Sequence, residues 1–168
     1  MKYTIGYLLN GKTKKYTENL MKKTVDISNE RYVVDVSKVP PHVTMKSHFE
    51  FNNYKKLEEF LKDFTAKRKK AKIKIISFDY FRGFFSLKFN FYKEAKKIRK
   101  DLVKELDNKL GIKPIENDLK YKPHTTICFS NTKKTFNIIW DYLKKQKKPK
   151  FYLELDNIIL FYKPKNRW

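Results

Sequence analysis

The tetrapeptide Pro-His-x-Thr occurs twice in this chain and contains two of its 3 histidines. The first copy runs from Pro41 to Thr44 and the second from Pro123 to Thr126. The copies lie about half a chain length apart, and each precedes a segment with the apolar spacing of a helix. The duplication favours a fold with two similar halves, each of which contributes one motif.

Both motifs are predicted to lie on strands. Because residues i and i+2 of a strand project to the same face, His42 points with Thr44, and His124 points with Thr126. The proline before each histidine has no backbone N–H, which favours the start or the edge of a strand. We therefore expect each histidine near the mouth of a sheet rather than deep inside it.

The rest of the chain alternates between strand and helix patterns. Helices are predicted at about 13–26, from Asn52 or Asn53 to about 69, at about 95–110 ending at Gly111, and after Thr132. Strands are predicted at 2–9, 32–36, 42–51, 72–80, 84–91 and 124–129, and segment 151–162 is predicted as one long strand or two short ones. A polar connector is predicted at 113–122. This order predicts an α/β (α+β) fold, with residues 1–168 forming a single domain.

The charge of the chain suggests a polyanionic partner. The formal net charge is +22 at pH 7, which attracts nucleic acid first and an anionic membrane surface second. The alternative is that the excess reflects lysine used as a general solubilising residue, without a functional role. One cysteine excludes an internal disulfide, and no apolar window has the length of a membrane span, so we expect a cytoplasmic protein.

The two motifs have the residue types that phosphodiester chemistry needs. Histidine titrates near neutral pH, so one imidazole can accept a proton while the other donates one. Threonine hydroxyls can donate hydrogen bonds to phosphate oxygens as negative charge builds on them. We therefore predict His42, His124, Thr44 and Thr126 as catalytic residues, with no metal and no cofactor.

Other residues near the motifs receive weaker assignments. If no bulge intervenes, Lys46 and His48 share the face of Thr44; Lys46 is then a candidate phosphate contact, whereas His48 lacks the motif and is expected to be a bystander. Cys128 is expected to pack in the core, and Thr125 points to the opposite face and is expected to be structural. Four aromatic residues are candidates for stacking on a base: Tyr80, Phe81, Phe84 and Tyr162.

Two His-x-Thr motifs half a chain apart resemble the two-histidine phosphoesterase superfamily, and within it the group of 2'-5' RNA ligases, also described as RNA 2',3'-cyclic phosphodiesterases. The resemblance implies a bilobed, pseudo-symmetric fold with a mostly antiparallel sheet and outer helices in each lobe and a central cleft. It also implies metal-independent hydrolysis of a 2',3'-cyclic phosphate or 2'-5' linkage, with reversible ligation in some members. For opening a cyclic phosphate, we take His42 as the acid and His124 as the base, an order that the motifs do not fix.

Several alternatives stay open from the sequence. The substrate is an RNA end or a small nucleotide, such as a cyclic nucleotide or an ADP-ribose cyclic phosphate. A non-catalytic RNA-binding module of the same fold is a second class, and a metal site on His42, His48 and His124 is a third. No obligate protein partner and no membrane association are indicated.

Overall fold

The computed structural model describes residues 1–28, 39–81, 83–130, 132–147 and 149–163. The strand predicted at 32–36 lies outside these residues. The strands are β1 (Lys2–Leu8), β2 (His42–Glu50), β3 (Ala71–Phe81), β4 (Phe84–Phe91), β5 (His124–Phe129), β6 (Tyr152–Leu155) and β7 (Ile159–Lys163). The predicted segment 151–162 is thus two strands, which join different sheets.

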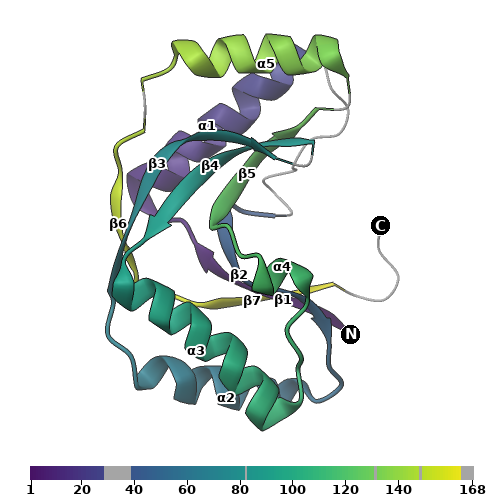
Figure 1. The fold of residues 1–168 in the computed structure, drawn as a ribbon, viewed down its shortest axis with the longest axis vertical. Coiled ribbons are helices and arrows are strands. Elements are labelled where there is room, and N and C mark those ends of the chain that lie inside the picture. The colour runs from purple at the N-terminus through teal and green to yellow at the C-terminus, as the bar shows by residue number, and fades with distance from the viewer. Residues whose placement is uncertain (29–38, 82, 131, 148, 164–168) are drawn as a thin grey trace.

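Two antiparallel sheets organise the described residues (Figure 1). One has the strand order β2–β1–β7, and the other has the order β5–β4–β3–β6. All pairings are antiparallel, and both strands that begin with a motif histidine, β2 and β5, are edge strands. The motifs therefore lie at the margins of their sheets, as the prolines predicted.

The helices are α1 (Gly11–Ser28), α2 (Tyr54–Ala66), α3 (Lys93–Leu110), α4 (Glu116–Leu119) and α5 (Lys133–Lys145). Helix α1 packs beside β5 and α5, whereas α3 packs against β2 and lies next to α2 (Figure 1). Helix α1 precedes β2 in the chain yet covers the sheet of β5, and α3 precedes β5 yet packs against β2. The two halves thus exchange one helix each.

One pattern of elements occurs twice. The first half has the order β1-α1-β2-α2-β3. The second half repeats it as β4-α3-β5-α5-β6, with the short helix α4 inserted before β5 and the strand β7 added at the end. The last strands cross over, because β3 pairs with β4 and β7 pairs with β1. The fold is a mixed α/β arrangement of two lobes, each with an antiparallel sheet and outer helices, as predicted.

Local sequence explains where the helices begin and end. The Asn53 side chain accepts a hydrogen bond from the backbone N–H of Lys56 at 3.0 Å and so caps α2. The Thr132 hydroxyl accepts from the N–H of Thr135 at 3.1 Å and caps α5 in the same way. Gly111 ends α3 with φ 68°, a left-handed conformation that glycine adopts without steric cost.

Candidate active site

The two motif strands meet between the sheets. One cavity is lined by His42, Thr44, His124 and Thr126 together. It continues into a larger open cleft of about 280 Å³, and Thr44 and His124 line both spaces. The Thr125 hydroxyl donates a hydrogen bond to the carbonyl oxygen of His42 at 2.8 Å, which joins the two strands directly. The structure thus brings the four predicted residues together from both lobes.

Each motif histidine is held by the same ring nitrogen. Nδ1 of His42 lies 2.9 Å from the carbonyl oxygen of Pro40, and Nδ1 of His124 lies 2.7 Å from that of Lys122. A carbonyl oxygen can only accept, so this contact assigns a proton to Nδ1 in both rings. Nε2 then stays available to accept or donate a proton in the cavity.

The proline of each motif also takes an equivalent place in its sheet. The carbonyl oxygen of Pro41 accepts a hydrogen bond from the N–H of Leu9 at 3.0 Å, and that of Pro123 accepts from Phe89 at 2.9 Å. Proline has no N–H to donate, but its carbonyl starts the ladder of an edge strand in both lobes. The pseudo-symmetry extends to single hydrogen bonds.

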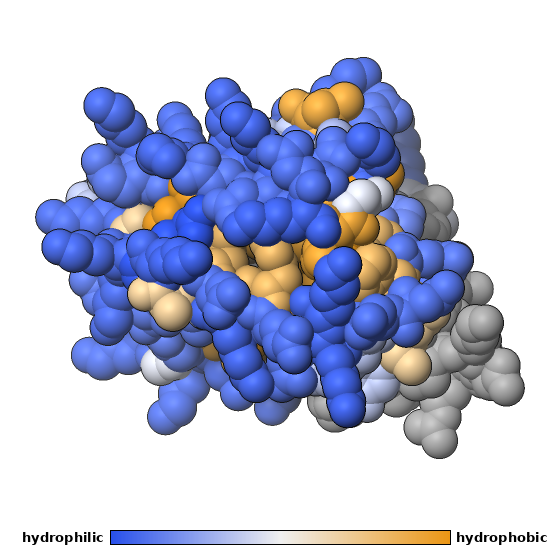
Figure 2. Space-filling view, turned by 90° about the horizontal axis from the view of Figure 1, so that it is seen from below, coloured by the Kyte–Doolittle hydropathy of each residue, from blue (hydrophilic) through white to orange (hydrophobic). Residues whose placement is uncertain are grey.

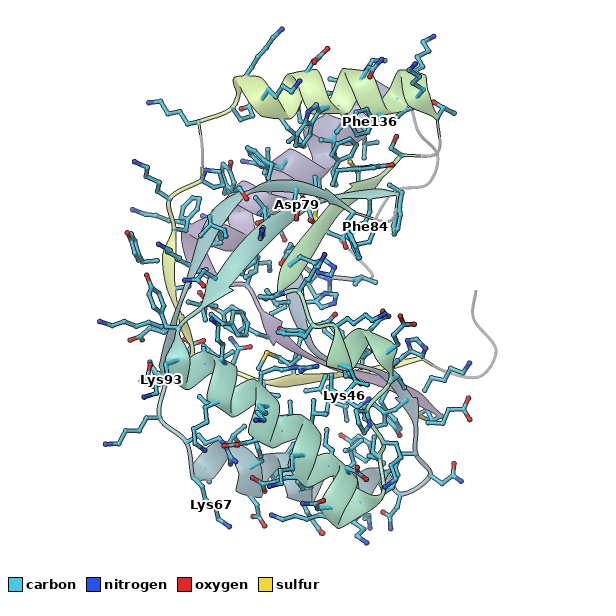
Figure 3. The ribbon with its side chains drawn as sticks, viewed as in Figure 1. Lys46, Lys67, Asp79, Phe84, Lys93 and Phe136 are labelled. Atoms are coloured by element: carbon cyan, nitrogen blue, oxygen red, sulfur yellow. The ribbon has the colours of Figure 1, made fainter. Side chains whose placement is uncertain are left out.

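An aromatic ring lies beside each histidine. The ring centroids of His42 and Phe161 are 4.5 Å apart, and those of His124 and Phe84 are 5.1 Å apart, with the second pair stacked at 27°. Phe84 lies at the end of the upper sheet in Figure 3. Of the four candidates for base stacking, Phe81 and Phe84 line the open cleft. These rings fix the planes of the imidazoles and limit their rotation.

A β-bulge follows Thr44. Thr44 pairs with Gly6 and Lys46 pairs with Ile5, so Met45 is an extra residue on β2. A bulge breaks the alternation of a strand and turns the residues beyond it. Lys46 consequently faces the core, although strict alternation placed it beside Thr44.

Lys46 is fully buried and lies away from the cleft. Its side chain is 0% exposed, and its ammonium donates to Oδ2 of Asp118 at 2.7 Å. Figure 3 shows it in the lower lobe, among the elements around the three-stranded sheet. An ammonium that is desolvated and paired in this way does not reach a substrate, so we do not retain Lys46 as a phosphate contact.

Asp118 of α4 is the centre of a buried polar network behind the bulge. Its carboxylate also accepts from the backbone N–H of Ser47 at 2.9 Å and of Ile115 at 3.0 Å. Arg99 of α3 approaches the same carboxylate at 3.5 Å, and its Nε donates to the carbonyl oxygen of Met45 at 3.1 Å. Burial alone would raise the pKa of Asp118, but these hydrogen bonds and the nearby ammonium lower it below its ordinary value.

The second motif has the same bulge. Thr126 pairs with Ser86 and Cys128 pairs with Phe85, so Ile127 is the extra residue on β5. Cys128 therefore packs in the core with 3% exposure, as expected for a packing residue. A bulge directly after the threonine of each motif turns the residue two positions on, Lys46 or Cys128, into the core.

The cleft has a second wall that the motifs did not predict. Ser47 and His48, just beyond the first bulge, line it together with Thr4. Opposite them, α4 and the turn after it contribute four residues: Asn117, Lys120, Tyr121 and Lys122. The predicted polar connector 113–122 forms this wall, and its only sequence signal was a cluster of polar residues between a helix and a motif.

Comparison with known proteins identifies the family. Residues 19–166 match the family described as the 2'-5' RNA ligase superfamily. This match covers well over half of the chain and includes both motifs. The chain belongs to the 2'-5' RNA ligase superfamily. No curated protein matches it.

A solved structure has the same fold as this member of the 2'-5' RNA ligase superfamily. The crystal structure of TT0787 of Thermus thermophilus superposes with a TM-score of 0.60 and 14% sequence identity. The match covers 98% of this chain and 91% of that one. At this identity the likeness shows the fold. The superfamily contains phosphoesterases and ligases that act on phosphodiester bonds, so the chain belongs to a family of enzymes.

The two histidines of this 2'-5' RNA ligase superfamily member differ in their surroundings. Burial lowers the pKa of His42 below its ordinary value, and the nearby His124 lowers it further. The hydrogen bond with the Pro40 carbonyl opposes these effects without outweighing them. His42 is therefore predominantly neutral at pH 7.

The positive charge of the chain is spread beyond the cleft. Figure 2 views the molecule from below and shows a face crowded with hydrophilic side chains around a smaller apolar area. On α2 and α3, three lysines pair with carboxylates four residues away: Lys62 with Glu58, Lys97 with Asp101, and Lys109 with Glu105. Because these lysines lie on outer helices and not at the cleft, the positive net charge does not by itself indicate where the site is. Among the described helices, none is long and apolar enough to cross a membrane.

Proposed function

We propose that this protein opens a 2',3'-cyclic phosphate at the end of an RNA to a 2'-phosphate, with His42 and His124 as the acid–base pair. The main support is the shared cavity, in which both imidazoles have Nδ1 held by a carbonyl and Nε2 available. Two imidazoles at one site match the two proton transfers of an in-line displacement at phosphorus. Membership of a family that acts on phosphodiester bonds supports the reaction class.

The proposed step balances without a metal or a cofactor. One imidazole takes a proton from water at Nε2 while the water oxygen forms a bond to phosphorus. The bond between phosphorus and the 3' oxygen breaks, and the second imidazole donates its Nε2 proton to that oxygen. The product has a 2'-phosphate and a 3'-hydroxyl, and the two histidines have exchanged protonation states.

Thr44 and Thr126 are proposed to stabilise the charge on the phosphorane-like transition state. Within the described residues, neither hydroxyl is committed to a hydrogen bond, and both threonines line the cavity of the histidines. Hydroxyls placed in this way donate to non-bridging oxygens, where negative charge grows during attack. Thr125, whose hydroxyl already donates to His42, has no such role.

The burial of His42 favours it as the base. A base must be neutral before the reaction, and desolvation disfavours the charged imidazolium of His42. His124 is then the acid that protonates the 3' oxygen. This order is the reverse of the one expected from the sequence. Ligation, in which a 5'-hydroxyl attacks the cyclic phosphate in place of water, would keep the two roles, whereas cleavage of a 2'-5' linkage by the 3'-hydroxyl would exchange them.

The test is incubation with an oligoribonucleotide that ends in a 2',3'-cyclic phosphate, in the presence of EDTA. Wild-type protein is expected to produce a 2'-phosphate end. His42→Asn and His124→Asn are expected to abolish turnover, because an asparagine amide can still donate to the Pro40 or Lys122 carbonyl but cannot transfer protons. Lys62→Ala, on the outer helix α2, is the control and should keep full activity.

The other outcomes separate the alternatives. Turnover only of a mononucleotide or an ADP-ribose cyclic phosphate would replace RNA as the substrate. RNA binding without turnover by a folded wild-type protein would indicate a binding module. Activity that requires an added divalent metal would overturn the metal-independent scheme.

A further inference from the structure

The open cleft extends past the reacting histidines along a second set of polar side chains. From Thr44 and His124 it continues to Ser47 and His48 on β2, and to Asn117 and Lys120 on the facing segment. The proposed reaction needs the first pair but uses none of the others. An RNA chain that continues from a terminal nucleotide at these histidines has room along this part of the cleft.

Two irregularities of β2 bring Ser47 and His48 to the cleft together: the extra residue Met45, and a second register shift between the pairs Ile5–Lys46 and Tyr3–Phe49. Without the extra residue Met45, alternation would put Lys46 in the cleft and Ser47 in the core. The buried carboxylate of Asp118 holds the N–H of Ser47 at 2.9 Å, and Arg99 holds the Met45 carbonyl at 3.1 Å. The buried pair of Lys46 and Asp118, together with the half-buried Arg99, thus fixes the backbone from which Ser47 and His48 project.

The chemistry of this wall suits a phosphate. The described residues that line the cleft include two lysines, Lys120 and Lys122, and no aspartate or glutamate. Within the same described residues, no hydrogen bond or ion pair holds the His48 imidazole. Hydroxyl, imidazole and ammonium groups thus line this part of the cleft. A phosphodiester is the anion that an RNA chain would bring to such donors.

Lys120 has a partner that a phosphate can displace. Its ammonium lies 2.8 Å from Glu116 one helical turn away, and the two side chains are 73% and 65% exposed. Exposed pairs of this kind contribute little to stability, so the lysine can exchange Glu116 for a ligand oxygen at small cost.

We propose that Ser47, His48 and Lys120 form a subsite for the phosphodiester one nucleotide before the reacting phosphate, so that the enzyme selects oligonucleotide ends over mononucleotides. This inference rests on the proposed function, since the reacting phosphate defines the start of the cleft. It assigns His48 to substrate binding, whereas the sequence placed it among bystanders.

The test compares three substrates: a mononucleoside 2',3'-cyclic phosphate, a dinucleotide that ends in the same group, and that dinucleotide with an uncharged methylphosphonate linkage. We expect kcat/KM to be higher for the charged dinucleotide than for either of the others by about tenfold or more, mainly through KM. His48→Ala and Lys120→Ala should each reduce this preference severalfold, and His48→Gln, which keeps a donor, should reduce it less. Lys62→Ala removes one positive charge outside the cleft and should leave the preference unchanged.

Equal kcat/KM for the three substrates, or a full preference in His48→Ala and Lys120→Ala, would overturn the subsite. Failure of the reaction itself is distinguishable, because binding is measured separately by calorimetry with unreactive 3'-phosphorylated dinucleotides. If no substrate turns over, weaker binding of the methylphosphonate analogue to wild type but not to His48→Ala still supports the subsite, and equal binding overturns it.

Discussion

The Thr125 hydroxyl donates a hydrogen bond to the carbonyl oxygen of His42 at 2.8 Å, across the boundary between the two sheets. Thr125 comes directly after one motif histidine, and its acceptor is the backbone of the other. Thr125 therefore fixes the backbone of the first motif, while its neighbours His124 and Thr126 line the cavity. This single bond ties the geometry of the site to the relative position of the two lobes.

Removal of this bond should destabilise the fold and misplace the site. Thr125→Val keeps the shape of a side chain with 2% exposure but leaves the His42 carbonyl without its donor. We expect a loss of about 1–3 kcal/mol in the free energy of unfolding, measured by urea denaturation, together with a lower kcat.

Thr65→Val is the matched control for Thr125→Val. Its hydroxyl bonds to the Leu61 and Lys62 carbonyls on the exposed side of α2, where water can replace it. An equal loss of stability in both variants would show that the contact between the lobes has no special weight.

The cavity threonines should affect turnover rather than binding. Thr44→Val and Thr126→Val each remove a donor aimed at the developing charge, so kcat should fall about 100-fold or more with a much smaller change in KM. Steady-state kinetics on the cyclic-phosphate oligonucleotide measures both constants. A rise in KM with unchanged kcat would assign these hydroxyls to ground-state binding instead.

The pH dependence follows from the lowered pKa of His42. NMR titration of the imidazole C–H signals should place His42 below its ordinary 6.5, and the acidic limb of kcat/KM should lie in the same range. In His124→Asn the pKa of His42 should rise but stay below 6.5, because burial remains after the neighbouring charge is gone. An unchanged His42 titration in that variant would argue against coupling of the two rings.

The same shift predicts a stability effect with a definite sign. The folded-state pKa is below the unfolded one, so the unfolded chain binds more protons between these two values. Stability should therefore fall as pH drops from about 6.5 towards the folded pKa of His42. His42→Asn should show a flatter profile over this interval in urea denaturation at several pH values.

Much of this fold could be predicted because its signals are local. The caps at Asn53 and Thr132 and the left-handed Gly111 depend on residues within one turn, so the sequence places the ends of α2, α5 and α3 to within a few residues. The position of the motif residues at the start of β2 and β5 was also predictable, since proline fixes the strand start and the first three positions still alternate.

The bulges were not predictable from local pattern. Nothing in Met45-Lys46 breaks the alternation, and the residues that fix the bulge, Arg99 and Asp118, lie far along the chain. The sequence consequently placed Lys46 in the cleft and missed Ser47. The exchange of α1 and α3 between lobes was hidden for the same reason, because it depends on contacts between segments distant in sequence.

The Asp118 network should be essential to the lower lobe. Asp118→Asn leaves the buried Lys46 ammonium without its counter-charge, so we expect a loss of about 3–5 kcal/mol in the free energy of unfolding. Lys46→Met removes the buried positive charge, and the Asp118 carboxylate stays bonded to Arg99 and to the backbone. The free energy of unfolding should therefore fall by less than in Asp118→Asn.

The pH dependence of stability gives a second test of this network. The wild type should lose the stabilisation from the Asp118 carboxylate only as pH falls through its lowered pKa, whereas Asp118→Asn should show no such loss. Equal stability of wild type and Asp118→Asn would contradict the assignment.

Gly6 should be required for the orientation of His42. It pairs with Thr44 on the neighbouring strand, and a Cβ at this position would lie 3.0 Å from Cε2 of Phe161 and 3.3 Å from Cδ2 of His42. The carbonyl oxygen of Val43 would also lie 3.3 Å away, so Gly6→Ala requires these neighbours to give way by a few tenths of an ångström. We expect the shift of the rings to reduce kcat up to about 100-fold with a modest loss of stability. The comparison that isolates the cause is the double variant Gly6→Ala/Phe161→Leu, since leucine removes the atom of closest approach. We expect the double variant to recover activity relative to Gly6→Ala, measured against Phe161→Leu alone in a double-mutant cycle. Strictly additive losses would show that Gly6 acts on the site by a route other than the packing of Phe161 on His42.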